Sequence, residues 1–267
     1  NVKYKDVRDA LNLAFDGGKR LRPIISLLIS ENINKINNTN YNLDNLIILS
    51  EMIHTSSLII DDLPCMDNDI CRRNNPTIHY KYGERSAQIL TMNIMTSVFS
   101  LFYTNLKELK NQGISDFIER EKIMNNTITD TLGIFGAPLG QYLDITNKDP
   151  FTKSSITELI QKKTGTFFEI SFVLGYIGSG GDIKYIDDIK EASNSFGIAF
   201  QISDDFQDAE EDSQREGCPN FVNCIGINGS KLTFYNHLKN CKNILIKLNL
   251  YNDTFKEIFE ILYSRVK

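Results

Sequence analysis

Apolar residues recur at helical spacing through several long segments of this chain, and no segment alternates in the way that a half-buried strand does. Residues 46–61, LIILSEMIHTSSLIID, and residues 156–178, ITELIQKKTGTFFEISFVLGYIG, are examples. The second is apolar almost all the way round, which is typical of a helix buried inside a large bundle. Proline is scarce, with 6 residues, and turn signals such as GSGGD separate the segments. The sequence therefore predicts an all-α fold of about ten helices, in a single domain over residues 1–267.

Composition and charge narrow the kinds of partner. The 267 residues are 41% hydrophobic and 24% charged, as in an ordinary globular protein. The formal net charge of −5 does not suggest a nucleic-acid partner. We find no run of about 18 apolar residues and expect no membrane span in this chain. An anionic substrate remains possible where basic residues or metal ions compensate its charge.

The cysteines bear on the compartment. There are five, an odd number, and none stands in a CxxC pair: Cys65, Cys71, Cys218, Cys224 and Cys241. A disulfide framework or a zinc ribbon is therefore not expected, and a cytoplasmic or other reducing compartment is favoured. Because the sequence starts at Asn1 rather than Met, we expect that residues precede it in the whole protein, where a targeting or anchoring segment could lie.

Carboxylates gather where one predicted helix ends. Asp61 is the last residue of the apolar run 46–61, and Asp62 follows it. Pro64 ends the helix, so that Asp67 falls on the following loop. Carboxylates at a helix C-terminus oppose the helix dipole. A solvated loop is one interpretation of this cluster. A divalent cation that compensates the charge is the other.

A second carboxylate cluster lies within a predicted helix, in QISDDFQD, residues 201–208. Asp204 and Asp208 are four residues apart and share a helix face, which Gln201 joins. Like charges on one face repel each other, and the repulsion grows where the site is partly buried. Hard oxygen ligands that leave room for water and phosphate oxygens suit magnesium.

Basic residues stand in three motifs: Arg72 and Arg73 directly after the first cluster, Lys19 and Arg22 in GGKRLRP, and Lys163 in QKKTG. They are either solvated bases or ligands of a phosphate, which arginine binds as a planar fork and lysine as a point charge. The two glycines of GGKRLRP would give its bases a flexible backbone, and the Thr-Gly pair of QKKTG can kink its helix and free a carbonyl.

Together these motifs resemble those of the trans-isoprenyl diphosphate synthases, in particular the short-chain geranylgeranyl and farnesyl diphosphate synthases. The matching stretches, in family order from about residue 17 to residue 208, are GGKRLRP, EMIHTSSLIIDDLPCMDNDICRR, NPTIHYKYGE, GQYLDI, KKTG and GIAFQISDDFQD. The string MIHTSSLIIDDLPCMDND is similar to the first aspartate-rich motif of that family in its DDxxxxD form. The resemblance implies an isoprenoid-synthase-type helical bundle around a deep central cavity, usually as a homodimer.

The resemblance also implies a reaction. An allylic diphosphate (dimethylallyl, geranyl or farnesyl) ionises, and isopentenyl diphosphate attacks the carbocation head to tail. Loss of a proton then gives an allylic product longer by one isoprene unit. Mg²⁺, with about three ions in the substrate complex, would neutralise the leaving diphosphate.

Site residues follow from the motifs by this resemblance. Four carboxylates would hold the magnesium ions: Asp61, Asp67, Asp204 and Asp208. Two more would support them: Asp62 and Asp205. Three residues would contact the allylic diphosphate: Arg72, Lys163 and Thr164. Four would bind isopentenyl diphosphate: Lys19, Arg22, His54 and Arg73. Gln201 would lie near the reacting carbons, and Asp69 has no such role and is expected to be solvated.

The residues just before the first cluster bear on product length, which the family sets by side-chain bulk there. Ser56 and Ser57 are small, so we expect an open cavity floor. The two extra residues of the motif, Pro64 and Cys65, resemble the geranylgeranyl type. We therefore favour geranylgeranyl diphosphate as the product. Farnesyl diphosphate is the close alternative, because other residues could block the cavity: Met92, Met95 and Phe99.

The sequence departs from the family after Asp208. Relatives usually carry a lysine-bearing loop there, whereas this chain reads AEEDSQREGCPNFVNCIG, and Lys231 is a weak substitute. Met92 also stands where relatives often have Asp. Two alternatives therefore stay open: a terpene synthase on the same fold, and a non-catalytic partner subunit. The retained isopentenyl diphosphate motif argues against the first, and the presence of both aspartate clusters argues against the second.

Overall fold

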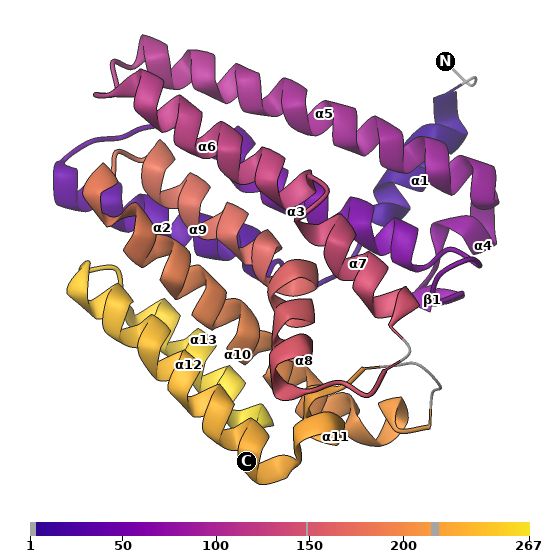
Figure 1. Ribbon diagram of the computed structural model, residues 1–267. Coiled ribbons are helices and arrows are strands. Elements are labelled where there is room, and N and C mark those ends of the chain that lie inside the picture. The colour runs from indigo at the N-terminus through magenta and orange to yellow at the C-terminus, as the bar shows by residue number, and fades with distance from the viewer. Residues whose placement is uncertain (1–3, 148, 215–218) are drawn as a thin grey trace.

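Helices make up most of the computed structural model, which describes residues 4–147, 149–214 and 219–267 (Figure 1). The α-helices in chain order are α1 (Lys5–Ala14), α2 (Leu21–Asn37), α3 (Asp44–Asp61), α4 (Ile78–Tyr82), α5 (Glu84–Asn111), α6 (Phe117–Leu132), α7 (Ala137–Thr146), α8 (Lys153–Ile160), α9 (Thr166–Gly178), α10 (Ile186–Asp212), α11 (Phe221–Ile225), α12 (Ile227–Lys247) and α13 (Asp253–Arg265). A π-helical turn, η2 (Gln161–Gly165), joins α8 to α9, and a 3₁₀ turn, η3 (Ile183–Tyr185), precedes α10. The all-α prediction is confirmed.

Helix α9 lies at the centre of the bundle. Nearly every residue from Phe167 to Gly178 is buried, as the all-round apolar pattern predicted. Its neighbours are α2, α3, α6 and α10, and Figure 1 shows α2, α9 and α10 running side by side. A cluster of aromatic rings joins α9 to α10, with Phe168 and Phe196 in an edge-to-face contact at 5.0 Å between ring centroids. The central helices therefore form a rigid frame for the cavity that they border.

A close approach of two glycines sets the spacing between η2 and α10. A Cβ atom on Gly197 would lie 2.8 Å from the Cα atom of Gly165, which is closer than real side chains approach. The two backbones can pass at this distance because Gly197 has no side chain. This contact brings Thr164 opposite Gln201. The helix distortion that the Thr-Gly pair predicted is present as the π-helical turn, a form that is frequent at functional sites.

A short β-hairpin was not predicted from the sequence. Strands β1 (Cys71–Arg72) and β2 (Asn75–Pro76) pair antiparallel, with Arg72 opposite Asn75. The two-residue turn between them consists of Arg73 and Asn74, with φ angles of 55° and 62°. Positive φ at both positions is the requirement of a type I′ turn, which Asn and Gly usually satisfy. The strands are too short for an alternating pattern, and arginine is an uncommon residue at this position.

Helix α8 begins after Thr152, which is its capping residue. Its hydroxyl accepts from the backbone N–H of Ser155 at 3.1 Å, and the hydroxyl of Ser155 accepts from the backbone N–H of Thr152 at 2.9 Å. This reciprocal capping box satisfies two N–H groups of the first turn.

Helix α5 differs from the expectation about membrane spans. Its 28 residues are long and apolar enough to cross a membrane by length and composition alone, and 39% of the apolar window is buried in the structure. One such helix is weak evidence, because a core helix of a bundle passes the same test. The exposed apolar side chains on α5 are Ile89, Met92, Phe99 and Tyr103.

Candidate active site

A cavity of about 860 Å³ collects most of the residues that the motifs singled out. Its lining includes basic side chains from the α1–α2 loop, α2, the hairpin and η2, and carboxylates from the middle and C-terminal end of α3 and from α10. Apolar and small side chains from α3, α5, α6 and α7 complete the wall. The predicted site residues in the lining are Lys19, Arg22, His54, Ser56, Ser57, Asp61, Arg72, Arg73, Lys163, Thr164, Gln201 and Asp204.

Four predicted site residues lie outside this lining. Asp67 and Asp208 are exposed, on the loop after α3 and on α10. Asp62 and Asp205 are buried behind the cavity wall, with exposed fractions of 4% and 6%. The structure therefore divides each aspartate cluster into a lining member, an exposed member and a buried member.

The first cluster surrounds Lys163. Burial raises the pKa of Asp61 to about 6, and the positive charge of Lys163 opposes this rise. Lys163 donates from Nζ to a carboxylate oxygen of Asp144 in α7. Gly140 permits this contact, because a side chain there would collide with the backbone of Lys163. Asp144 belongs to the GQYLDI stretch but had no role assigned from the sequence.

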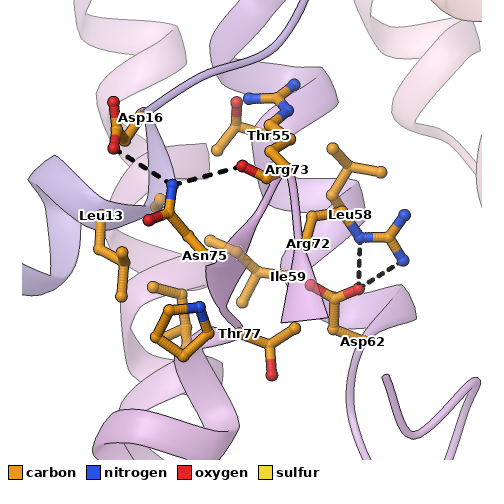
Figure 2. Close-up of a pocket in the computed structure, with 13 residues that line it drawn as sticks. Leu13, Asp16, Thr55, Leu58, Ile59, Asp62, Arg72, Arg73, Asn75 and Thr77 are labelled. Atoms are coloured by element: carbon orange, nitrogen blue, oxygen red, sulfur yellow. Dashed lines mark hydrogen bonds and ion pairs between the residues drawn. The ribbon is translucent and has the colours of Figure 1, made fainter. Parts of the chain in front are cut away.

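The buried member of the first cluster holds the hairpin. Asp62 accepts from Arg72 Nε at 2.7 Å and from Arg72 Nη2 at 2.6 Å (Figure 2). Asp69 accepts from Arg72 Nη2 at 2.9 Å, and its backbone oxygen accepts from Thr77 Oγ1 at 2.8 Å. The expectation that Asp69 is merely solvated was therefore wrong, since the residue fixes the arginine and the hairpin.

The second cluster surrounds a different cation. Asp204 accepts from Arg265 Nη1 at 2.5 Å, and Lys19 and Arg265 both oppose the burial that raises the pKa values of Asp204 and Asp208. Arg265 lies at the end of α13 and was not predicted as a site residue. Its contact spans 61 residues of sequence, and no motif surrounds it.

A hydrogen-bonded chain runs inward from this cluster. Thr164 Oγ1 donates to Gln201 Oε1 at 2.8 Å, and Gln201 Nε2 donates to Asp205 Oδ1 at 2.8 Å. The other oxygen of Asp205 accepts from the backbone N–H of Phe221 at 2.7 Å. Burial raises the pKa of Asp205 to about 7. Asp205 thus orients Gln201 and holds the start of α11.

The side chains of Lys19, Arg20, Arg22, His54 and Arg73 form one wall of the cavity, called here the basic wall. Some of its polar atoms are buried and have no hydrogen-bond partner within the described residues: Arg22 Nε, Arg73 Nη1 and His54 Nδ1. Burial lowers the pKa of Arg22 to about 10, and burial together with neighbouring arginines holds the pKa of His54 well below its usual range. Buried donors without partners are costly, so this wall is suited to an anion that brings several acceptors.

Two residues at the basic wall, Arg20 and Glu51, were not predicted as site residues from the sequence. Arg20 and Arg73 both donate to the same oxygen, Glu51 Oε1, the second at 3.2 Å. A signal was present in the sequence, because Glu51 is the only acidic residue between Asp44 and Asp61 in an otherwise apolar run and precedes His54 by three residues.

The serines before the first cluster also lie at the cavity. Ser56 is 2% exposed and donates to Ile53 O at 2.8 Å, and its hydroxyl lies 3.0 Å from the sulfur of Met95 on α5. Of the three side chains predicted to narrow the cavity, Met95 is in the lining, while Met92 and Phe99 are exposed by 70% and 39%.

The carboxylates do not form a ready-made metal site. Within the part of the chain that the structure describes, no three His, Cys, Asp or Glu side chains lie close enough together to hold an ion. The donor set nevertheless fits magnesium, which is bound through one or two carboxylates plus substrate phosphates and waters. Within the described residues, Lys231 lies outside the cavity, with its Nζ donating to Lys267 O at 3.1 Å. Part of the acidic loop after Asp208, residues 215–218, falls outside the described residues.

Comparison with known proteins agrees with this geometry. The polyprenyl synthetase family model matches residues 5–221. A farnesyl diphosphate synthase of Buchnera aphidicola is 36% identical over 74% of this chain and 68% of that protein. A geranylgeranyl diphosphate synthase of Pseudescherichia vulneris is 28% identical over 87% of this chain and 76% of that protein.

A solved structure shares the arrangement of helices. A geranyltransferase of Helicobacter pylori, complexed with magnesium and isoprenyl diphosphate, superposes with a TM-score of 0.73 at 25% identity, covering 96% of this chain and 86% of that one. The family match, the relatives and the shared fold lead to one conclusion: this chain belongs to the polyprenyl synthetase family, whose similar members are short-chain prenyltransferases of the farnesyl and geranylgeranyl diphosphate synthase types.

Proposed function

We propose that this protein is a magnesium-dependent prenyl diphosphate synthase that condenses isopentenyl diphosphate head to tail with an allylic diphosphate. One observation carries the proposal: a single cavity joins lining carboxylates from two helices, a basic wall with unpaired buried donors, and an apolar portion. That combination suits a ligand with a diphosphate head and a hydrocarbon tail.

The allylic diphosphate would bind between the two aspartate clusters. Magnesium would be held by Asp61, Asp67, Asp204 and Asp208, and it supplies charge neutralisation that makes diphosphate a better leaving group. Lys163 and Arg72 line the same part of the cavity and would donate to the diphosphate as its charge develops. Asp62 keeps Arg72 in place through the two contacts described above.

Isopentenyl diphosphate would bind at the basic wall. Lys19, Arg22 and Arg73 supply positive charge there, and the unpaired nitrogens of Arg22 and Arg73 would donate to its oxygens. His54, held neutral by burial and by the arginines, can donate or accept a hydrogen bond without adding charge.

The carbocation needs dipoles and a dry environment rather than a nucleophile. Gln201 is held by Thr164 and Asp205 so that its amide can lie beside the reacting carbons. Phe167 and Phe200 line the cavity and exclude water, which would otherwise trap the cation. The proton lost in the last step can pass to the released diphosphate, so no side-chain base is required.

We favour geranylgeranyl diphosphate as the product, because Ser56 and Ser57 leave the wall before the first cluster free of bulky side chains. Farnesyl diphosphate is the second candidate. The observation that favours it is the 3.0 Å contact between Ser56 and Met95, which places a long side chain across from the small one.

We further propose that the chain acts as one domain and as a homodimer. The exposed apolar side chains of α5, among them Ile89, Met92 and Tyr103, support a second copy as the occupant of that face. Sedimentation measurements on the purified protein would test this, with a concentration-independent monomer contradicting it.

One assay tests the reaction. Protein is incubated with Mg²⁺, farnesyl diphosphate and labelled isopentenyl diphosphate. A labelled prenyl diphosphate supports the synthase. Repeating the incubation with the shorter primers dimethylallyl and geranyl diphosphate identifies the product length. An unlabelled hydrocarbon or alcohol would instead identify a terpene synthase. The absence of any product, with activity appearing only on addition of an active synthase, would identify a partner subunit.

A further inference from the structure

Glu51 is an acidic residue in the middle of the basic wall. Its carboxylate lines the cavity beside Lys19, Arg20, Arg22 and Arg73. Its side chain is only 9% exposed, and one oxygen accepts from both Arg20 and Arg73. A site that only concentrated positive charge for an anion would be weakened by a buried carboxylate. Its presence therefore calls for a role other than charge.

The backbone around Glu51 is held in uncommon conformations. Arg20 and Arg73 both have positive φ, at 52° and 55°, which side-chain-bearing residues adopt at a cost. The guanidinium of Arg73 lies directly against Gly18, where a Cβ atom would be 2.6 Å from its Cζ atom. Gly17 and Gly18 have φ of 67° and 87°. Beyond flexibility, these two glycines provide the flat surface on which Arg73 lies.

The hairpin that carries Arg73 is fastened on its other side. Asn75 donates from Nδ2 to Asp16 Oδ2 at 3.1 Å, and Figure 2 shows this contact joining the hairpin to the α1–α2 loop. Arg73 is thus held by Glu51 at its guanidinium, by Gly18 along its face and by Asn75 at its base. Its Nη1 remains buried and without a hydrogen-bond partner among the described residues.

Resting on the proposed function, we infer that Glu51 is a positioning residue for isopentenyl diphosphate, which it serves by orienting Arg20 and Arg73 before the substrate binds. One carboxylate oxygen shared by two guanidinium groups screens their mutual repulsion. Arg73, which lines the cavity, is then held in one orientation before the substrate arrives. Binding does not have to order two long side chains, and this lowers its entropic cost.

Two physical effects of replacing Glu51 have opposite signs, which makes the inference testable. Glu51→Gln removes a negative charge beside an anion site, and this alone would tighten diphosphate binding. It also takes the carboxylate away from both guanidinium groups. Arg20 keeps its contact with Phe15 O, whereas Arg73 loses its orientation. If Glu51 positions the arginines, Glu51→Gln should bind isopentenyl diphosphate more weakly. If Glu51 only balances their charge, Glu51→Gln should bind it more tightly.

The experiment is calorimetric titration of the folded chain with isopentenyl diphosphate alone, so that no turnover is needed. Glu51→Gln should weaken this binding by about tenfold, while binding of geranyl diphosphate with Mg²⁺ changes less than about twofold. Glu169→Gln is the matched control, because Glu169 pairs with Lys190 at 3.2 Å and is not in the cavity lining. Unchanged or tighter binding by Glu51→Gln would overturn the inference.

Two further variants keep the test decisive if Glu51→Gln is unstable. Gly18→Ala should also weaken isopentenyl diphosphate binding selectively, because the new Cβ displaces the guanidinium of Arg73. The double variant Arg73→Lys, Glu51→Gln should lose no more affinity for isopentenyl diphosphate than whichever of the two single variants binds more weakly, because both substitutions act through the guanidinium of Arg73. Fully additive losses would contradict positioning through Arg73. If the wild-type chain binds isopentenyl diphosphate but makes no product, the proposed synthase activity is refuted, and the titrations of the variants still decide the role of Glu51. If the wild-type chain does not bind isopentenyl diphosphate, the role of Glu51 is refuted.

Discussion

Arg265, at the end of α13, donates from Nη1 to Oδ1 of Asp204 at 2.5 Å. Asp204 is the member of the second aspartate cluster that lines the cavity. A side chain from the last described helix therefore occupies a carboxylate oxygen that the proposed reaction needs for a metal ion. Arg265 also lies over the ring of Phe200, 5.8 Å from its centroid, so it is positioned by packing as well as by charge.

Replacing Arg265 should make the metal site easier to fill. In Arg265→Gln, Asp204 loses the cation that is bonded to its Oδ1, and we expect the Mg²⁺ concentration for half-maximal synthase activity to fall by roughly three- to tenfold, since an ion pair of about 1 kcal/mol is lost. The measurement is initial rate against Mg²⁺ concentration. Lys247→Gln is the control, because Lys247 pairs with Asp188 on α10 away from the cavity. An unchanged or higher magnesium requirement in Arg265→Gln would contradict the competition.

Product length should respond to both sides of the Ser56–Met95 contact. Ser56→Tyr fills the path and should shorten the main product by one isoprene unit. Met95→Ala opens it and should lengthen the product or increase the longer fraction. Chromatography of the dephosphorylated products gives the distribution. Met92→Ala serves as the control, because Met92 is 70% exposed on the same helix and should leave the distribution unchanged. An identical product profile in all three variants would place the length determinant elsewhere.

Asp205 should matter for both stability and turnover. In Asp205→Asn, one amide oxygen must replace two carboxylate oxygens that accept from Phe221 N and Gln201 Nε2. We expect a loss of about 1–3 kcal/mol in the free energy of unfolding, because one buried donor is left unpaired. We also expect a lower kcat with little change in the KM for isopentenyl diphosphate, because Gln201 loses its orientation. Asp187→Asn, at an exposed position in the first turn of the same helix, should cost less than about 0.5 kcal/mol. Equal effects of the two variants would rule out this role.

The contribution of His54 to the stability of the protein should fall in mild acid, while the raised pKa values of Asp61 and Asp205 act in the opposite direction. Its folded-state pKa lies well below the usual value, so below about pH 6.5 the unfolded chain binds a proton that the folded chain does not. The His54 contribution to the free energy of unfolding therefore decreases as pH falls, by up to about 1.4 kcal/mol per pH unit. His54→Gln should lose about 1–2 kcal/mol less than wild type between pH 6.5 and pH 5, measured by urea unfolding. Above pH 7.5 the two pH slopes should coincide, and coinciding slopes below pH 6.5 would refute the prediction.

Much of the fold and of the candidate site could be predicted from the sequence, because the patterns that indicate them lie within single helices. Apolar spacing identified the buried helix α9, Pro64 located the end of α3, and the i, i+4 spacing placed Asp204 and Asp208 on one face. Each of these depends on residues within a few turns of one helix, where backbone geometry alone relates spacing to position.

The tertiary structure decided which charges meet. Arg265 stands in no motif, and Glu51 and Asp144 lie in motifs that assigned them no role, yet each pairs with a cation or carboxylate of the cavity from another segment. The hairpin turn at Arg73 and the glycine contact between Gly165 and Gly197 likewise depend on how two backbones approach each other. Sequence spacing fixes faces within a helix, but the contacts of Glu51, Asp144 and Arg265 join residues 19 to 61 positions apart, which no local pattern encodes.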